Sequence, residues 1–214
     1  MLFRSVSAII RQQLAGFKSE AELEEVGTVL QVGFIFYEKS ARYFNGTIPE
    51  LIKTIKKVGV FVNESVENII EKINEHNLQA IQLHGTESVA FCQELKSKIN
   101  KKIEIIKVFS VGDDFDFEVL QPFEEVCDYF LFDTKGKLPG GNGTTFDWKI
   151  LKNYKSNKPF FLSGGIGIEE IAAIKNLKLP VYAIDVNSRF EIEPGLKNKN
   201  LLTNFKRKLE IVNL

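Results

Sequence analysis

The residues best suited to chemistry in this sequence lie where short apolar runs end. Asp133 directly follows the run from Tyr129 to Phe132, and four glycines stand in the loop that comes next, from Lys135 to Gly143. Glycine costs conformational entropy on folding, so this loop indicates a close approach to a ligand. A partly desolvated acid there can keep its proton near neutral pH and act as a general acid. The alternative is an ordinary connection whose acid caps the next helix, but the loop is too long for that.

Other polar residues recur at the same place relative to an apolar run. The residues concerned are Arg42, Asn63, His84, Asp133, Ser163 and Asp185. Taken singly, a lone histidine is more often a satisfied structural residue, and an arginine is more often a surface ion-pair partner. Their recurrence after so many runs favours one shared site.

Two glycine-containing or small-residue loops predict a phosphate site. Gly164 and Gly165 follow an apolar run and precede a predicted helix from Ile168 to Ile174, so their backbone N–H groups can face an anion. In parallel barrels the last two loops after strands often bind phosphate, which here means residues 163–167 and 185–188. Two tight turns without a ligand are the alternative.

The elements that must position these residues alternate along the chain. Apolar runs typical of strands recur, and residues with helical spacing lie between them. The runs are Val32–Phe36, Val58–Val62, Ala80–Leu83, Ile103–Phe109, Asp128–Phe132, Pro159–Leu162 and Val181–Ile184. With one more unit from the first thirty residues, this predicts a single α/β domain over residues 1–214, an eight-stranded TIM barrel. A doubly wound open sheet is the rival, but the sequence lacks a GxGxxG motif.

The opening unit is atypical. Residues 20–30 have a helical pattern, whereas residues 2–14 fit either a strand or a helix, because Phe3, Val6, Ile10 and Leu14 are also spaced for a helix.

Composition narrows the class of protein. The 214 residues include 28 basic and 28 acidic side chains, so no global field favours nucleic acid or an anionic membrane. Two cysteines, Cys92 and Cys127, fit neither a metal site nor a disulfide framework. No apolar block at the N-terminus is long enough for a signal peptide or a membrane span. We therefore expect a cytoplasmic protein with a small-molecule ligand, either a monomer or a homodimer.

Six blocks of sequence carry a resemblance to a known family. The blocks are VGFIFYEKSARYF (32–44), VGVFVNES (58–65), IQLHGTES (81–88), FDTKGKLPGGNGTTFDW (132–148), FLSGGI (161–166) and AIDVNSRFEIEPGLK (183–197). In this order they resemble phosphoribosylanthranilate isomerase. The resemblance implies an Amadori rearrangement of N-(5-phosphoribosyl)anthranilate to 1-(2-carboxyphenylamino)-1-deoxyribulose 5-phosphate in tryptophan biosynthesis, without metal or organic cofactor.

The same resemblance implies roles for individual residues. Asp133 matches the general acid that protonates the ribose ring oxygen, and Arg42 matches the arginine that binds the anthranilate carboxylate. Asp185 resembles a second acid of the site. The remaining substrate-binding positions are His84, Gly141, Ser163, Gly164, Gly165, Asn187 and Ser188.

The chain departs from the family at the general base. Family members have a cysteine in a Lys-x-Cys-Gly motif, and the alignment places Ala15 there, with Gln13 in place of the lysine. A methyl group accepts no proton, and general base catalysis contributes about a hundredfold to ten-thousandfold in rate. We therefore expect impaired turnover with binding retained. Cys127 stands at the start of its run, where it cannot replace the base.

Three explanations of this departure remain open at the level of sequence. They are an engineered substitution, a divergent or mis-assigned N-terminal segment, and a catalytically inactive barrel that still binds a phosphoribosyl ligand. An unrelated phosphosugar enzyme on the same fold is a weaker alternative, because barrels host many reactions.

Overall fold

The structure is a computed structural model, and it describes residues 6–9, 29–51, 53–134 and 147–210. The first strands are β1 (Val6–Ile9), β2 (Val29–Ile35), β3 (Lys56–Phe61), β4 (Ala80–Leu83) and β5 (Glu104–Val111). They are followed by β6 (Tyr129–Thr134), β7 (Phe160–Leu162), β8 (Val181–Val186), β9 (Glu191–Glu193) and β10 (Leu196–Lys197). The helices are α2 (Val66–Glu75), α3 (Val89–Lys98), α4 (Ile171–Lys175) and α5 (Lys199–Glu210). The 3-10 helices within these ranges are η2 (Phe117–Phe123), η3 (Trp148–Asn153) and η4 (Ser188–Phe190).

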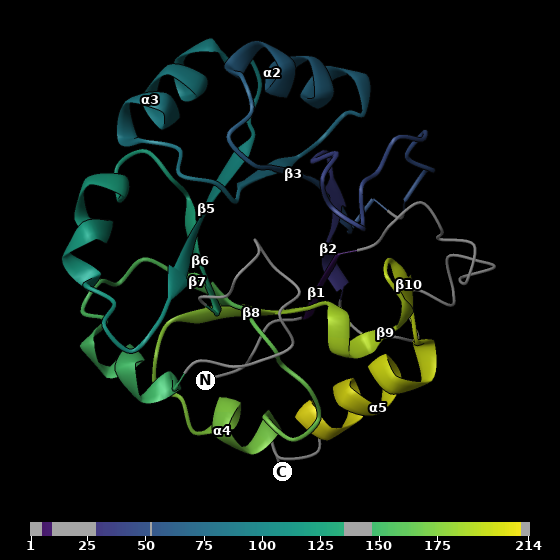
Figure 1. The fold of residues 1–214 in the computed structure, drawn as a ribbon, viewed down its shortest axis with the longest axis vertical. Helices are drawn as coiled ribbons and strands as arrows, with labels where there is room; N and C mark the ends of the chain where they lie inside the picture. Colours follow the sequence, from purple (N-terminus) through teal and green to yellow (C-terminus); the bar gives the residue numbers. More distant parts are fainter. Residues whose placement is uncertain (1–5, 10–28, 52, 135–146, 211–214) are drawn as a thin grey trace.

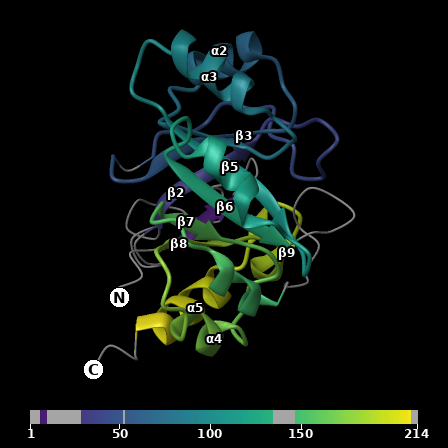
Figure 2. The ribbon, with the colours of Figure 1, turned by 90° about the vertical axis from the view of Figure 1, so that its left-hand side faces the viewer.

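Strands β1 to β8 form a closed parallel barrel in sequence order. Figure 1 shows the ring of strands with α2 and α3 on one side and α4 and α5 on the other, and Figure 2 shows the same separation after a quarter turn. The ring closes where β1 pairs with β8, with Ser7 opposite Asp185. The predicted α/β barrel is therefore confirmed.

The first strand is short and irregular. It covers four residues, and its register with β2 shifts between Val6 and Ala8. Of the two interpretations of residues 2–14, the structure has the strand, over Val6–Ile9. The predicted helix over residues 20–30 is wrong at its end, because Val29 and Leu30 belong to β2; its other residues lie outside the described chain.

Two apolar clusters hold the barrel together. The smaller cluster takes residues from strands alone, so it fills the inside of the ring. Its members are Val58, Ala80, Ile106, Val108, Leu131, Phe161 and Ala183. The larger cluster joins the outward faces of the strands to the helices, for example Phe61 and Ile105 to Ile69 and Leu95. Because side chains alternate along a strand, one sequence run supplies both clusters.

Helices α2 and α3 follow the expected pattern of caps and buried faces. Ser65 and Ser88 each accept a hydrogen bond from the backbone N–H three residues on, both at 3.2 Å. Val66, Ile69 and Ile73 of α2 are buried at helical spacing. The predicted helix over Ile168–Ile174 is shorter than expected, because α4 begins only at Ile171.

The segment after β8 contains a two-stranded hairpin that the sequence pattern does not predict. β9 and β10 pair in antiparallel fashion and lead into α5, which packs beside α4 (Figure 1). Gly195 adopts φ 91° in the turn, a conformation that favours glycine. No helix in the described ranges is both long and apolar enough to cross a lipid bilayer.

Candidate active site

Strand alternation places the polar residues at one end of the barrel interior. Residues two apart on a strand share a face, so Asp133 lies above Leu131, Ser163 above Phe161 and Asp185 above Ala183. The lower residue of each pair belongs to the interior cluster. A polar layer therefore covers an apolar layer at the carboxyl ends of the strands, where barrel enzymes place their chemistry.

A cavity of about 320 Å³ opens above this polar layer. Among its lining residues are nine of the eleven positions to which the family resemblance gives a site role. These nine are Arg42, His84, Asp133, Ser163, Gly164, Gly165, Asp185, Asn187 and Ser188. The other two positions, Ala15 and Gly141, lie outside the described residues. Asn63, the remaining polar residue noted at a strand end, is not among the lining residues, and its Oδ1 accepts hydrogen bonds from Thr86. Since β2 stands across an eight-stranded ring from β6, Arg42 and Asp133 approach the cavity from facing sides.

Asp133 is buried at the carboxyl end of β6. One carboxylate oxygen, Oδ1, accepts a hydrogen bond of 2.9 Å from the Thr134 N–H. The other, Oδ2, lies 3.4 Å from Nε2 of His84, and this nitrogen is buried without a hydrogen-bond partner among the described residues. The side-chain amide of Gln82 lies 3.1 Å from Nδ1 of His84. If Gln82 donates this bond, the histidine proton is on Nε2 and faces Asp133.

Asp185 is the second buried acid of the cavity. Its Oδ2 accepts a hydrogen bond of 3.0 Å from the hydroxyl of Ser163, while Oδ1 is buried without a partner among the described residues. Burial raises the pKa of Asp185 to about 6, and the bond from Ser163 only partly opposes this shift. An acid with this pKa exchanges a proton near neutral pH.

The loop after β7 brings backbone, rather than side chains, to the cavity. Gly164 and Gly165 have φ angles of 89° and 61°. A Cβ atom on Gly164 would lie 2.5 Å from the Thr134 backbone nitrogen, so only glycine fits against β6. Together with Asn187 and Ser188, this loop offers small, donor-rich groups that suit an anion.

Arg42 belongs to a buried cluster of charges. Its Nε donates to Glu191 Oε1 and Oε2 at 3.0 and 3.1 Å, and its Nη2 donates to Oε2 at 2.6 Å. Nζ of Lys197 donates to Glu191 Oε1 at 2.8 Å and to Asn187 Oδ1 at 2.6 Å. Burial opposes ionisation of Glu191, but its two cationic partners outweigh burial and lower its pKa. Burial also lowers the pKa of Lys197 to about 8.

Sequence reasoning missed Glu191, Lys197 and Gln82. The first two lie in the last matched block, EIEPGLK, as charged residues in a hairpin that no local pattern predicts. Gln82 stands two residues before His84 in β4, so alternation along the strand was a signal for it. None of the three ends an apolar run, whereas Asp133, Ser163 and Asp185 each do.

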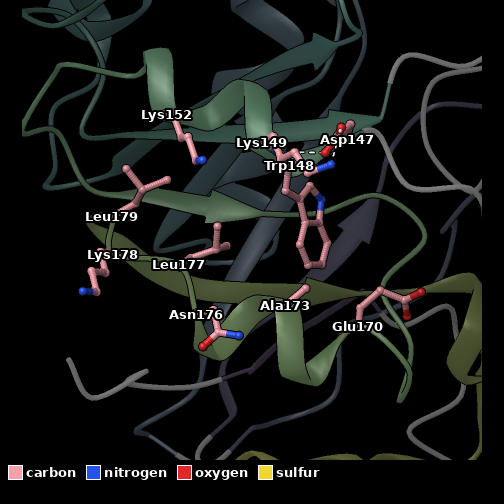
Figure 3. A pocket seen from close by; sticks show the side chains of 10 residues that line it. All are labelled: Asp147, Trp148, Lys149, Lys152, Glu170, Ala173, Asn176, Leu177, Lys178 and Leu179. Atoms are coloured by element: carbon pink, nitrogen blue, oxygen red, sulfur yellow. Dashed lines mark hydrogen bonds and ion pairs between the residues drawn. The ribbon is translucent and has the colours of Figure 1, made fainter.

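A second, larger groove lies outside the barrel, between η3 and α4 (Figure 3). It has a volume of about 640 Å³, and the indole of Trp148 points across it toward Ala173. At one end Lys149 forms an exposed ion pair of 3.6 Å with Asp147. None of the polar residues from the strand ends lines this groove, so the barrel mouth is the better candidate for chemistry.

The described residues also bear on metal binding and on the role of Cys127. Within the described ranges, no group of three or more His, Cys, Asp or Glu side chains is placed to hold a metal ion. Cys127 is buried directly before β6, at the end of the strand remote from Asp133. A hydrogen bond with Cys92 and burial both raise the pKa of Cys127, so it is not a thiolate base.

Comparisons with known proteins point in one direction. A profile of the family N-(5'phosphoribosyl)anthranilate (PRA) isomerase matches residues 14–208. The chain is 42% identical over 202 residues to N-(5'-phosphoribosyl)anthranilate isomerase of Parabacteroides distasonis, with 90% of each chain covered. Phosphoribosyl anthranilate isomerase of Thermotoga maritima superposes with a TM-score of 0.81 at 30% identity, covering 99% of this chain and 100% of that chain.

One similar crystal structure contains a ligand. It is a phosphoribosyl anthranilate isomerase in complex with reduced 1-(o-carboxyphenylamino)-1-deoxyribulose 5-phosphate. It superposes with a TM-score of 0.77 at 28% identity and covers 97% of this chain and 99% of that chain.

Proposed function

The chain belongs to the N-(5'-phosphoribosyl)anthranilate isomerase family, and we propose that it converts N-(5'-phosphoribosyl)anthranilate to 1-(2-carboxyphenylamino)-1-deoxyribulose 5-phosphate in tryptophan biosynthesis. The family match confirms the resemblance read from the sequence. One structural observation carries the proposal for this chain: a buried acid, an arginine and two glycine- or serine-containing loops line a single cavity.

The reaction we propose begins at Asp133. Its carboxylic acid donates a proton to the ribose ring oxygen as the bond from that oxygen to C1 breaks, and the anilinic nitrogen lone pair forms a C=N bond to C1. The proton on C2 then passes to a base, a role that a thiolate would fill and the Ala15 methyl group does not, and the released electron pair forms the C1=C2 bond and neutralises the nitrogen. In the resulting enol the proton on O2 moves to C1, which gives the C2 ketone, and the proton taken from C2 returns to Asp133, so no cofactor is needed.

The two ends of the substrate carry charges that the cavity can meet. Arg42 is proposed to bind the anthranilate carboxylate, because a guanidinium matches a carboxylate with two parallel hydrogen bonds. The phosphate is assigned to Ser163–Gly165 and Asn187–Ser188, where backbone N–H groups and hydroxyls converge. Asp185 and His84, which each have a buried polar atom without a partner among the described residues, are assigned to the sugar between them.

The proposal extends to the protein as a whole. We infer a single domain over residues 1–214, located in the cytoplasm, that acts on a small molecule and not on nucleic acid. Balanced charge and two free cysteines support this inference. A monomer and a homodimer are both compatible with it.

Turnover of phosphoribosylanthranilate tests the proposal directly. The substrate is fluorescent, and we expect its fluorescence to fall when it is mixed with purified protein. The Ala15→Cys variant, measured beside the unmodified chain, should turn over faster, because a thiolate at this position supplies the base that removes the C2 proton. No fluorescence change with either protein would reject the isomerase function.

A further inference from the structure

We propose that Glu191 is a positioning residue: it holds the guanidinium of Arg42 so that one edge remains open for the substrate carboxylate. This inference rests on the proposed function. It adds to that function a residue that determines how the anthranilate carboxylate is recognised. Arg42, Glu191 and Lys197 are called the charge cluster below. Glu191 contributes from β9, in the hairpin that follows the loop assigned to phosphate.

The guanidinium of Arg42 can bind two carboxylates at once. A guanidinium has two edges that can each bind a carboxylate with two parallel hydrogen bonds, one formed by Nε and Nη2 and one formed by Nη1 and Nη2. Glu191 occupies the Nε and Nη2 edge, with contacts between 2.6 and 3.1 Å. Glu191 does not contact Nη1, so the second edge can bind another carboxylate where Arg42 lines the cavity.

Burial of its partners restricts the motion of Arg42. The side chain of Glu191 is 4% exposed and that of Lys197 is 1% exposed, whereas the side chain of Arg42 is 16% exposed. Glu191 also accepts a hydrogen bond of 3.0 Å from the Gly195 N–H. The carboxylate is therefore fixed from three directions, and an arginine attached to it cannot swing freely into solvent. A long side chain that is already ordered loses less entropy when ligand binds.

The net charge of the cluster favours binding of an anion. The charge cluster contains two cations and one anion, so it has an excess of one positive charge, and Arg42 is the member that lines the cavity. Lys197 links this charge to the loop assigned to phosphate, because its Nζ donates to both Oδ1 and the backbone carbonyl of Asn187. A substrate carboxylate on Arg42 completes the charge balance, and it joins a network that already includes the other anion-binding loop.

Positioning and charge predict opposite results for Glu191→Gln. If Glu191 only reduces the positive charge of Arg42, the substitution raises the local charge and tightens binding of a carboxylate. If Glu191 positions Arg42, the substitution leaves the guanidinium disordered and weakens binding, because glutamine has one acceptor oxygen where two cations and an amide need to be held. The sign of the change therefore separates the two roles.

The experiment measures the affinity of two ligands by calorimetry. One ligand is reduced 1-(o-carboxyphenylamino)-1-deoxyribulose 5-phosphate, and the other is the same reduced compound made from aniline, which lacks the carboxylate. The dissociation constant of the aniline-derived ligand divided by that of the carboxylate ligand reports recognition of the carboxylate alone. We expect Glu191→Gln to lower this ratio by about tenfold, the cost of ordering one long side chain, and to leave the aniline-derived ligand unaffected.

Two comparisons show that Glu191 acts through Arg42. Glu193→Gln changes the same residue type on the same strand at an exposed position, and it should leave the ratio unchanged. In an Arg42→Ala background, Glu191→Gln should not lower the ratio further, because the group that it positions is gone. A further loss in that background would contradict the inference.

Other results would also overturn the inference. Tighter binding of the carboxylate ligand by Glu191→Gln would assign Glu191 to charge reduction, and equal weakening of both ligands would assign it to general stability. If the single variant does not fold, the paired variant Glu191→Gln with Lys197→Met restores the excess of one positive charge, and the same loss of ratio is expected. Failure of the unmodified chain to bind either ligand would instead reject the proposed function, and the inference with it.

Discussion

Removing the charge of Asp185 should stabilise the folded protein near neutral pH. Burial, and to a smaller extent the neighbouring Asp133, raise the pKa of this acid from 3.8 to about 6, although Ser163, Lys197 and His84 oppose the shift. A group whose pKa is higher in the folded state favours folding while it is protonated and loses that advantage as pH rises through the folded value. A shift of about two units corresponds to a penalty of about 3 kcal/mol above pH 6.

The Asp185→Asn variant removes this penalty and keeps an oxygen that can accept the hydrogen bond from Ser163. We expect its gain in the free energy of unfolding, relative to the unmodified chain, to be larger by about 2–3 kcal/mol at about pH 7.5 than at about pH 4. A constant offset is also expected, because the new amide N–H₂ lies where Oδ1 has no partner among the described residues. The pH-dependent part therefore isolates the effect of the charge.

Urea denaturation at several pH values measures both quantities. Asp113→Asn, at an exposed position, is the matched control, and its effect should change little between the same pH values. We also expect Asp185→Asn to bind the reduced ligand more weakly, since polar groups kept in a site for function commonly reduce stability. A stability difference that is independent of pH would refute the argument, because it would mean that Asp185 ionises in the folded protein as easily as in the unfolded chain.

Two further substitutions test the structure around the cavity. Gly164→Ala should lower the free energy of unfolding by about 1–3 kcal/mol, measured by urea denaturation, because it places a side chain on a left-handed backbone and against Thr134. It should also weaken the binding of phosphate-containing ligands. Unchanged stability would contradict this account. Lys107→Met should lower stability by about 3–5 kcal/mol, because it leaves Glu87 buried without the ion pair of 3.0 Å. The more exposed pair of Lys72 and Glu75 is the control, and Lys72→Met should change stability little; equal losses would show that burial does not matter.

Much of the fold follows from local patterns. Seven of the eight barrel strands overlap runs that are visible as apolar stretches, because a strand covered on both faces needs apolar side chains throughout. The candidate site followed from the same pattern. Asp133, Ser163 and Asp185 interrupt their runs at the end where the interior opens, so a change from apolar to polar marks the mouth. The glycines of the β7 loop were visible in the sequence too, and both have the positive φ angles that glycine adopts most readily.

Other features depend on contacts between distant parts of the chain. The sequence could not decide between strand and helix for the first residues, because a four-residue strand is specified mainly by its neighbours β2 and β8. Periodicity also placed a helix over Val29 and Leu30, where pairing with the rest of the sheet makes a strand.

The charge cluster shows most clearly what the sequence alone determined. Sequence identified Arg42 as a cation near the end of a strand, and the family resemblance gave it a carboxylate to bind. Only the tertiary structure brings it to Glu191, 149 residues away, and to the buried Lys197. Local pattern records whether a side chain is polar and where its strand ends. The partner of a buried charge is decided by the closure of the barrel, which brings the β2 loop beside the hairpin after β8 and excludes the water that would otherwise solvate both.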